Sequence, residues 1–528
     1  MAERFGLRIA PPSLPDLLAG VSVALVALPQ ALAYAELAGM PPVAGLWAIV
    51  PALLLAAPFL SAREVQVGPV ATTSLLAFGT LSALAVPGGE RWALLAAVLA
   101  LLVGVIRLAI GLLGWGRIAY LLSRSVRVGF LNAAAVLIAA SQIPAALGVP
   151  ATGGVIGSAG RALRSPQIWD PVAIAFAAGT IACIVLARRL HPLVPGVLIA
   201  VVAAVIASRV LGYAGPVVGG IENAWPTLRL DLPWEAIPRL MIGAVVLALV
   251  GFSEAAAIGR DLAARARRPW SPDREFVAQG IANLGAGAFG GFPVGASFSR
   301  SAVAREAGAT SRWSGFVTGV TLLAALPFAP LLAPLPQAVL AGVILAALAS
   351  LIRPVELISV LRDSRSQGVI AISTFVLTLA LAPRIDEAVL IGVLLAIGQH
   401  LRREQHLRLD IVRVGDAIRI APIGVFWYGS AQRFDEAIPD LLAEHADANA
   451  LIVDLSGCGM VDWSAARAIR EALEQARDLG LEIGIERVPI HARRWSDSVW
   501  RDVTVATGAR ATGDGADPPS GRSGPPPS

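Results

Sequence analysis

Apolar runs recur between residues 16 and 400 of this chain, and many approach the roughly 20 residues that a helix needs to span a bilayer. Few folds are open to such a chain, because lipid offers no hydrogen-bond partner and every backbone polar group must be satisfied within the protein. The composition agrees, with 56% hydrophobic residues, 15% charged residues and a mean hydropathy of +0.70. We therefore predict a multi-pass α-helical membrane protein, with an unusually apolar soluble enzyme as the less favoured alternative.

Fourteen segments are candidate spans, although several are short for a full crossing. They lie at 16–36, 43–60, 69–85, 92–114, 120–141, 171–189, 195–212, 237–258, 275–291, 294–307, 313–330, 335–352, 368–382 and 386–400. Gly and Pro precede the third and the tenth segments, which predicts half-length helices at these two places.

Arginines between these segments and near their ends are distributed unevenly. If the N-terminus is placed inside and the chain crosses fourteen times, 18 arginines fall on the inner side and 7 on the outer side. Cytoplasmic loops carry such an excess of basic residues. The pattern predicts a protein of the cell (inner) membrane whose N- and C-termini are both cytoplasmic.

The chain divides into regions of different composition. A cytoplasmic segment at 1–15 is followed by a first block of spans at 16–212, an extracellular-side connection at 213–236 and a second block of spans at 237–400. A small cytoplasmic α/β domain is predicted at 401–505, with strands at 407–413, 417–420 and 450–456 and helices at 430–444 and 463–479. Residues 506–528 are rich in Gly, Pro and Ser, which predicts a disordered tail.

A shift of 224 positions relates the two blocks of spans. It superimposes Gln30 on Glu254 and Pro69 on Pro293, since 254 − 30 and 293 − 69 are both 224. Each block thus holds a polar residue in its first span and, 39 residues later, an interrupted segment, VGPVATTS or GFPVGASF. Because seven spans is an odd number, the two blocks would cross the membrane in opposite directions as inverted repeats.

The two interrupted segments predict a binding site halfway through the membrane. One helix would restart near Val70 and Ala71 and the other just before Ser297, so that their N-termini point at each other. Unpaired N–H groups and the positive end of the helix dipole attract anions. Ser297, Arg300 and Ser301 share one face of the second helix. Arg300 would add a full positive charge, unless it reaches the cytoplasmic surface or pairs with a carboxylate.

Glu254 is a carboxylate within a predicted span, where desolvation favours its protonated form. This suits a role in proton coupling, in which Glu254 is protonated while an anion is carried. A structural ion pair with Arg300 and a hydrogen-bonded neutral acid are the alternatives. Gln30, its counterpart in the first block, can hydrogen-bond a substrate but cannot titrate.

Other classes of function find no support in the sequence. The five His residues form no metal-binding pair, the two Cys residues are far apart, and no cofactor motif is present. No nucleophile and base occur in a catalytic arrangement, so an enzyme is not predicted. The basic residues are scattered at the ends of apolar segments, which indicates cytoplasmic loops rather than nucleic acid as a partner.

Motifs in this order are typical of one family. LPQALAYAELAGMPPVAGLWA at 28–48, VGPVATTSLL at 67–76 and GFPVGASFSRSAV at 291–303 resemble the SulP (sulfate permease) anion transporters. DLSGCGMVDWSAARAI at 454–469 resembles the core of a STAS domain, which family members carry after the last span. The resemblance implies fourteen spans arranged as a 7+7 inverted repeat, divided into a core and a gate domain and followed by a STAS-like domain.

The resemblance also implies where the substrate binds. An anion site lies between the third and tenth spans and moves by an elevator-like shift of the core against the gate. Gln30 and Tyr34 match the first-span positions that line this site, and Phe298, Ser299 and Arg300 match the tenth-span contacts with the anion. Family members also commonly form homodimers in which the STAS domains take part.

Two further positions follow from the comparison of motifs. Glu254 matches an acidic coupling position that some bacterial members have in the eighth span, whereas sodium-coupled relatives carry Asp there and a different tenth-span motif. In soluble STAS relatives a phosphorylatable residue follows an Asp, but here Trp463 intervenes, so we interpret Asp462 and Ser464 as a turn and helix cap. The last strand and helix of that domain are hard to find in residues 491–508.

These features favour a secondary active transporter of small anions, of the sulfate, bicarbonate, chloride or dicarboxylate class, that works as a proton symporter. Its partners would be the anion, a proton, the lipid bilayer and a second copy of the chain, with no cofactor. An uncoupled anion channel or exchanger would use Arg300 without coupling through Glu254. A nucleobase transporter of the same fold would prefer carboxylates at both polar spans and has no need of Arg300.

Overall fold

The computed structural model describes residues 11–120, 123–191, 193–220, 225–229, 231–348, 352, 354–404 and 407–506. The chain separates into two compact units, Met1–Ala396 and Ile397–Ser528, and the division falls inside a long helix that contains residue 400. Most of the predicted N-terminal segment, residues 1–10, and nearly all of the predicted disordered tail, residues 507–528, lie outside the described residues.

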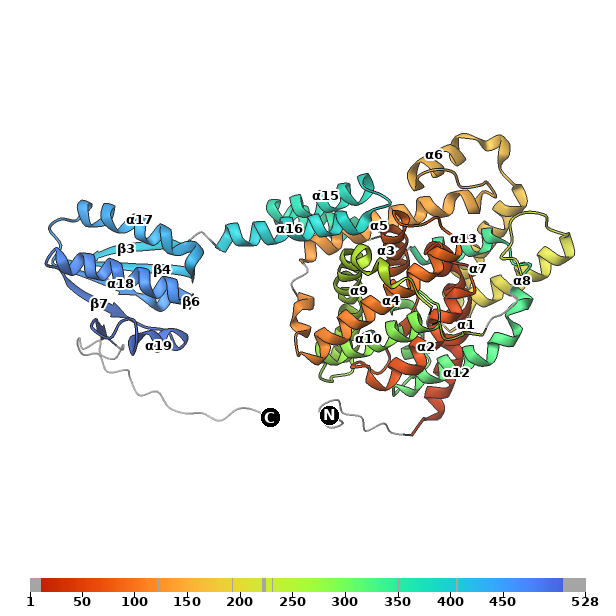
Figure 1. Ribbon diagram of the computed structural model, residues 1–528, viewed down its shortest axis with the longest axis horizontal. Coiled ribbons are helices and arrows are strands. Elements are labelled where there is room, and N and C mark those ends of the chain that lie inside the picture. The colour runs from red at the N-terminus through yellow and green to blue at the C-terminus, as the bar shows by residue number, and fades with distance from the viewer. Residues whose placement is uncertain are drawn as a thin grey trace, which may run out of the picture. The chain divides into compact units, whose positions relative to one another are not determined.

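The first unit is built of helices, most of which are labelled in Figure 1. They are α1 (Leu14–Leu37), α2 (Ala44–Ala56), α3 (Ala71–Ser82), α4 (Glu90–Leu112), α5 (Arg124–Ala146), α6 (Val155–Arg164), α7 (Pro171–Leu190), α8 (Gly196–Leu211), α9 (Ile237–Arg265), α10 (Pro272–Ala288), α11 (Phe298–Glu306), α12 (Trp313–Ala325), α13 (Gln337–Leu348), α14 (Pro354–Asp363), α15 (Arg365–Ala380) and α16 (Ile385–Glu404). Each of the fourteen segments predicted as spans coincides with one of these helices, and α6 and α14 are two short additions.

Several helices of this unit suit a bilayer by length and composition. Among the described residues, six helical stretches are long and apolar enough to cross a membrane, namely α1, α4, α5, α7, Trp234–Arg265 and Trp313–Leu332. Four shorter apolar helices accompany them at Ala44–Phe59, Gly196–Leu211, Gln337–Leu348 and Arg365–Ala380. The helices support a multi-pass protein, while the count of fourteen crossings and their 7+7 division stay predictions.

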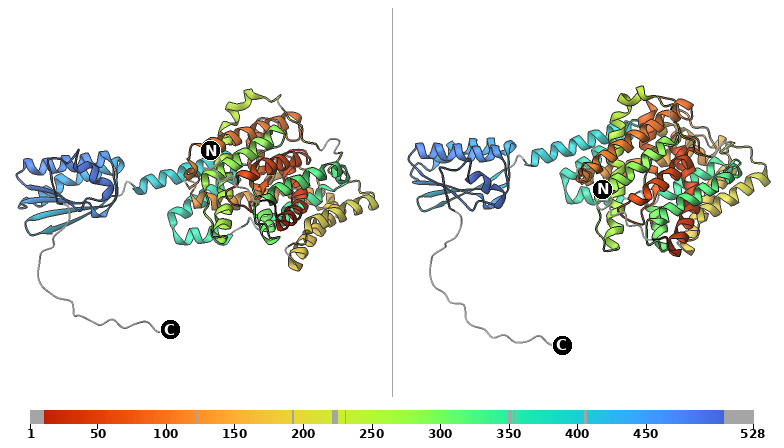
Figure 2. Two further views of the ribbon diagram at one scale, coloured as in Figure 1. Left: turned by 90° about the horizontal axis from the view of Figure 1, so that it is seen from below. Right: turned by 60° about the horizontal axis from the view of Figure 1, so that its bottom comes forward.

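Helices from the two halves of the chain pack between one another. α1 packs against α12, α2 against α10 and α12, and α4 against α9 and α10, so the red and orange helices lie among the green ones in Figure 2. The α4–α10 contact is close, as Gly280 shows: a Cβ on this residue would lie 2.7 Å from the Leu108 backbone nitrogen. Small residues at this crossing therefore let two apolar helices approach one another directly.

Two short antiparallel strands meet where the interrupted segments of the two halves cross. β1 (Val67–Gly68) pairs with β2 (Gly295–Ala296), and Gly68 lies opposite Gly295. Gly68 has a φ of 152°, a conformation that favours glycine, and a Cβ there would lie 2.7 Å from Ile49 Cγ1. The ladder thus depends on a residue without a side chain at its centre.

Each strand leads into a short helix. α3 begins at Ala71 and contains 12 residues, and α11 begins at Phe298 and contains 9, both fewer than the roughly 20 needed for a full span. The two helix starts are 227 residues apart (298 − 71). The shift of 224 that superimposed Pro69 on Pro293 is therefore wrong here by three residues, because Pro69 follows β1 whereas Pro293 precedes β2.

The second unit is a small α/β domain. Its elements are β3 (Arg408–Val414), β4 (Ala417–Phe426), α17 (Tyr428–Glu444), β5 (Ala450–Asp454), β6 (Cys458–Val461), α18 (Trp463–Asp478), β7 (Glu482–Glu486), α19 (Arg493–Ser496) and β8 (Thr504–Ala506). The strands run in the order β3-β4-β5-β7-β8, with β6 also paired to β4, and only the β3–β4 pair is antiparallel. The predicted strands and helices of this region are confirmed, and β6, β7 and β8 are additional.

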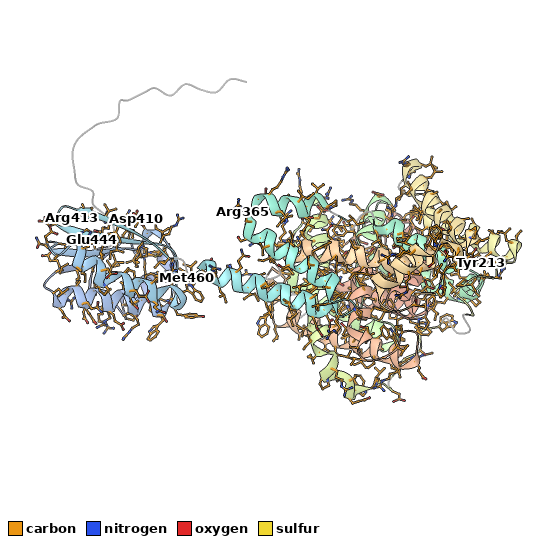
Figure 3. The ribbon with its side chains drawn as sticks, turned by 90° about the horizontal axis from the view of Figure 1, so that it is seen from above. Tyr213, Arg365, Asp410, Arg413, Glu444 and Met460 are labelled. Atoms are coloured by element: carbon orange, nitrogen blue, oxygen red, sulfur yellow. The ribbon has the colours of Figure 1, made fainter. Side chains whose placement is uncertain are left out.

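Helices α17 and α18 pack against each other and against the sheet. Asp462 caps α18, because its Oδ1 accepts a hydrogen bond from the Ala465 backbone N–H at 2.8 Å. Asp462 Oδ2 accepts a second one from the Tyr428 N–H at 3.0 Å, at the first residue of α17. The interpretation of Asp462 as a helix cap is therefore confirmed. Asp410, Arg413 and Met460 lie on the surface of this unit (Figure 3).

The C-terminal part of this unit is short, which explains why the sequence does not reveal it. α19 has four residues and β8 has three, too few for a periodic pattern. Hydrogen bonds from two tryptophan side chains hold this segment against the rest of the unit. Trp495 Nε1 donates to the Val461 carbonyl at 3.0 Å, and the fully buried Trp500 donates from Nε1 to the Ala466 carbonyl at 2.9 Å.

Candidate functional site

A cavity of about 220 Å³ lies in the first unit, where the first turns of α3 and α11 meet. One part of its wall comes from α1, α3, α9 and α11, and another part from α5, α7, α13 and α14. The lining residues are Tyr34, Val70, Ala71, Thr72, Leu76, Arg127, Val128, Phe130, Leu131, Arg188, Val250, Gly251, Ser253, Glu254, Ala257, Ser297, Phe298, Ser299, Ile344, Ala347, Leu348 and Glu356. The lining therefore combines segments from both halves of the chain.

Two helix N-termini border this cavity. The first intrahelical bond of α3 runs from the Ser74 N–H to the Val70 carbonyl at 3.0 Å, and that of α11 from the Ser301 N–H to the Ser297 carbonyl at 3.0 Å. The N–H groups before these residues have no partner within their own helices. No side chain caps α3, whereas Ser297 Oγ accepts a hydrogen bond from the Arg300 N–H at 3.4 Å. Both helix ends bring partial positive charge to the cavity.

Glu254 lies beside the first turn of α3. The Thr72 hydroxyl donates a hydrogen bond to Glu254 Oε2 at 2.6 Å, which joins α3 in the first half of the chain to α9 in the second half. Glu254 lines the cavity and is partly buried, so its carboxylate can contact both the cavity and the helix end. The arrangement places an ionisable group next to a site that favours negative charge.

Arg300 lies behind the cavity wall and is fully buried. Its Nη2 donates to the Pro69 carbonyl at 2.9 Å, and its Nη1 donates to Gln30 Oε1 at 3.4 Å. Its Nε has no acceptor among the residues that the structure describes. Arg300 interacts electrostatically with Tyr34 and Glu254 from this position. The contacts seen for it are thus with a main-chain oxygen and an amide oxygen, not with the surface.

The residues predicted from the sequence fall into two groups. Seven of them line the cavity together, namely Tyr34, Val70, Ala71, Glu254, Ser297, Phe298 and Ser299. Gln30 and Arg300 do not line it and are hydrogen-bonded to each other. Ser301, on the same helix face as Arg300, accepts a hydrogen bond from the Gln66 backbone N–H at 2.9 Å and so supports the strand crossing.

Sequence reasoning missed Arg107, a fully buried residue of α4. Its guanidinium donates to the carbonyls of Ala248 at 3.1 Å, Leu247 at 2.8 Å and Val294 at 3.0 Å. Val294 directly precedes β2, so Arg107 helps to fix the backbone from which α11 starts. The signal was present in the sequence, because an arginine inside a predicted span is costly and normally has a specific role.

Sequence reasoning also missed three charged residues that line the cavity. Arg127 on α5, Arg188 on α7 and Glu356 on α14 belong to its wall, and Arg124 forms an ion pair with Glu356 at 3.0 Å. From the sequence, Arg127 and Arg188 were expected only to be basic residues on the inner side of the membrane. Their place in the cavity wall follows from the packing of α5, α7 and α14, which no local pattern records.

Comparison with known proteins gives one family. The profile described as Sulfate permease family matches residues 14–374. A protein of Mycobacterium tuberculosis (strain ATCC 25618 / H37Rv), named a "Probable sulfate transporter", is 33% identical over 399 residues, which cover 74% of this chain and 70% of the relative. Sulfate transporter 4.1, chloroplastic, of Arabidopsis thaliana is 28% identical over 530 residues, covering 90% of this chain and 76% of the relative.

Solved structures share the fold. Murine Solute Carrier 26 family member A9, in the inward-facing state, has a TM-score of 0.85 at 21% identity and covers 96% of this chain and 93% of its own. The transmembrane domain of the cyanobacterium bicarbonate transporter BicA has a TM-score of 0.62 at 26% identity, with 73% of this chain and 97% of its own covered. The fold is thus a helical transmembrane region followed by an α/β region.

Proposed function

This chain belongs to the sulfate permease family of anion transporters, and from that premise we propose that it is a secondary active carrier of small anions, coupled to protons. The observation that carries the proposal is the meeting of two helix N-termini at one cavity, with Glu254 hydrogen-bonded to Thr72 beside them. The substrate class is sulfate, bicarbonate, chloride or a small dicarboxylate. The names of the relatives favour sulfate and bicarbonate among these.

Backbone N–H groups supply most of the attraction for the anion. Groups near Ala71 and Thr72 on one side, and near Phe298 and Ser299 on the other, face a shared cavity, and helix ends of this kind bind anions without a charged side chain. In this proposal Tyr34 and Phe298 shape the cavity. Arg300 acts from behind the wall, where its charge adds to the potential of the α11 end.

Proton coupling in this proposal runs through Glu254. An anion in the cavity lies beside the Glu254 carboxylate, and two negative charges at close range repel each other. Protonation of Glu254 removes the repulsion, so the anion and the proton are carried together. A pure channel has no need of a carboxylate at this position, which is why symport is favoured over an uncoupled channel or exchanger.

The movement that we propose is elevator-like. The cavity lies between the group α1, α3, α9 and α11 and the group α5, α7, α13 and α14, and within each group helices pack against one another. A shift of the first group against the second would carry the anion with its helix ends. Arg127 and Arg188 line the cavity from the second group, on the side that the arginine bias predicts to be cytoplasmic, and would draw anions towards it.

The roles of assembly and of the second unit also belong to this proposal. We propose a homodimer in the inner membrane, with cytoplasmic termini, in which the STAS-like unit serves assembly or regulation. Truncation after Arg402 tests the role of this unit. Loss of anion flux would indicate that the unit takes part in transport, and loss of the dimer alone would indicate that it serves assembly.

Anion uptake into proteoliposomes tests the function. Purified full-length protein is reconstituted and offered labelled sulfate, bicarbonate, chloride or succinate, with and without an imposed inward proton gradient. We expect uptake of at least one anion to rise with the gradient, and we expect Glu254→Gln to bind that anion without responding to the gradient. Wild-type uptake that ignores the gradient, together with unitary currents, would establish a channel instead.

A further inference from the structure

A second cavity, separate from the one described above, lies where several helices of the first unit end. It has a volume of about 700 Å³ and is lined from the loop before β1, the end of α4, the α9–α10 connection and the residue before α12. Four arginines line it, namely Arg63, Arg268, Arg274 and Arg312, together with the carboxylates Glu64 and Asp273. Positive charge is thus in excess within this cavity.

Two of the arginines are held in place by main-chain oxygens. Arg274 donates from Nε to the Phe59 carbonyl at 3.0 Å and from Nη2 to the Pro58 carbonyl at 3.3 Å. Arg312 donates from Nε to the Leu60 carbonyl at 2.7 Å. These contacts occupy one edge of each guanidinium and leave further N–H groups that have no acceptor within the described part of the chain.

The positive charges of the arginines in this cavity lie close enough to affect one another. Burial, followed by the positive charges of Arg274 and Arg63, lowers the pKa of Arg312 to about 10, so Arg312 remains protonated at neutral pH. The carboxylates Glu64 and Asp273 are two against four guanidinium groups, and Asp273 Oδ1 accepts its hydrogen bond from the Gly116 N–H, at 2.6 Å, not from one of these arginines. Arg63 and Arg268 are exposed and show no hydrogen bond or ion pair from their side chains among the residues described.

The cavity lies at the level where apolar helices end. α4 ends at Leu112, α9 ends at Arg265 and α12 begins at Trp313, and each belongs to a stretch long and apolar enough to cross a membrane. Beside the cavity, Leu113 and Trp115 are each 61% exposed. A basic pocket next to exposed apolar and aromatic side chains has the character of a membrane–water interface.

From these observations we propose that the cavity of Arg63, Arg268, Arg274 and Arg312 binds the phosphate group of an anionic ligand, distinct from the transported anion. Guanidinium groups match phosphate oxygens in geometry and charge. A phosphate can come from a lipid headgroup or from a soluble phosphate compound. The neighbouring Leu113 and Trp115 favour the lipid, whose acyl chains they can contact. The proposal does not depend on the transport function.

Lipid binding to the full-length protein in detergent tests this site. Native mass spectrometry measures how many phosphatidylglycerol molecules are retained as the lipid is titrated, with phosphatidylcholine as the zwitterionic comparison. Arg63→Gln with Arg268→Gln removes two charges that form no hydrogen bond or ion pair among the described residues, so the variant should fold. Arg164→Gln with Arg209→Gln removes two exposed arginines far from the cavity in sequence and serves as the matched control.

We expect wild type and control to retain phosphatidylglycerol in preference to phosphatidylcholine, and the cavity variant to need at least about tenfold more lipid. Inorganic phosphate that fails to displace the lipid identifies a headgroup site. Inorganic phosphate that binds in its place, with the same sensitivity to Arg63→Gln and Arg268→Gln, identifies a site for soluble phosphates. Equal binding of both probes by the cavity variant and wild type, or binding of neither probe by wild type, overturns the proposal.

Discussion

The guanidinium of Arg300 donates a hydrogen bond to the main-chain oxygen of Pro69 at 2.9 Å. Arg300 belongs to α11 in the second half of the chain, and Pro69 lies between β1 and α3 in the first half, 231 residues away. The same side chain also contacts Gln30 of α1. One buried arginine therefore holds together three segments around the cavity, and the two helix ends depend on each other for their position.

Substitution of Arg300 should affect both stability and anion affinity. Arg300→Ala leaves the Pro69 carbonyl and Gln30 Oε1 without a donor, which costs about 1–3 kcal/mol for each buried group. Arg300→Lys keeps the charge but cannot reproduce the two-pronged contact. We expect both variants to melt at lower temperature in detergent, and the Lys variant to retain more anion affinity in calorimetric titration. Unchanged melting in both variants would contradict the structural role.

Loss of the Thr72 hydroxyl should change the pH dependence of uptake. The hydroxyl donates to the Glu254 carboxylate at 2.6 Å and so stabilises its ionised form. In Thr72→Val the carboxylate loses this hydrogen bond, so we expect half-maximal proton-driven uptake at a higher pH than in wild type. Thr73→Val is the matched control, since Thr73 bonds to the Val70 carbonyl instead. Equal shifts in the two variants would rule out this account.

Arg107 should be needed for folding of the first unit. Arg107→Met removes three hydrogen bonds to carbonyls of α9 and of the segment before β2. We expect a loss of at least about 3 kcal/mol in the free energy of unfolding, because hydrogen bonds from a charged group are worth more than neutral ones. The control is Arg91→Gln, an exposed arginine on the same helix. Fluorescence-detected melting of the two variants gives the comparison, and similar melting refutes the assignment.

The thiol of Cys458 should be inert in the folded protein. Burial, followed by the negative charge of Asp454, raises the pKa of Cys458 to about 12. The neutral thiol, which bonds to the Pro422 carbonyl at 3.1 Å, is therefore the folded form. The folded pKa is above the unfolded one, so its contribution to stability is complete below about pH 8.5 and is lost as pH rises towards 12.

Iodoacetamide labelling at pH 8, followed by peptide mass spectrometry, checks the Cys458 prediction. We expect labelling at Cys458 only after denaturant is added, since the thiolate is the reactive form. Cys183, which is partly exposed, serves as the internal comparison. Rapid labelling of Cys458 without denaturant would show that the second unit opens readily or that the thiol ionises.

The positions of the helices in the membrane unit could be predicted from the apolar runs alone, because such a run has few alternatives to a helix in lipid. It also indicated where two of these helices are interrupted, since Gly68, Pro69, Pro293 and Gly295 disfavour continuous helix locally. Five of the predicted site residues that line the cavity, namely Val70, Ala71, Ser297, Phe298 and Ser299, lie at these two helix starts. Residues next to a helix start lie beside the cavity whenever that helix start itself borders the cavity.

Side chains further from the helix starts face directions that could not be predicted without the packing of the helices. Gln30 and Arg300 bond to each other behind the wall, Arg107 reaches from α4 to the start of β2, and Arg188 lines the cavity from α7. Each of these positions depends on how one helix is rotated and seated against another that is distant in the chain. Hydropathy and local motifs report on neighbours in sequence, whereas these contacts are set by packing between the halves.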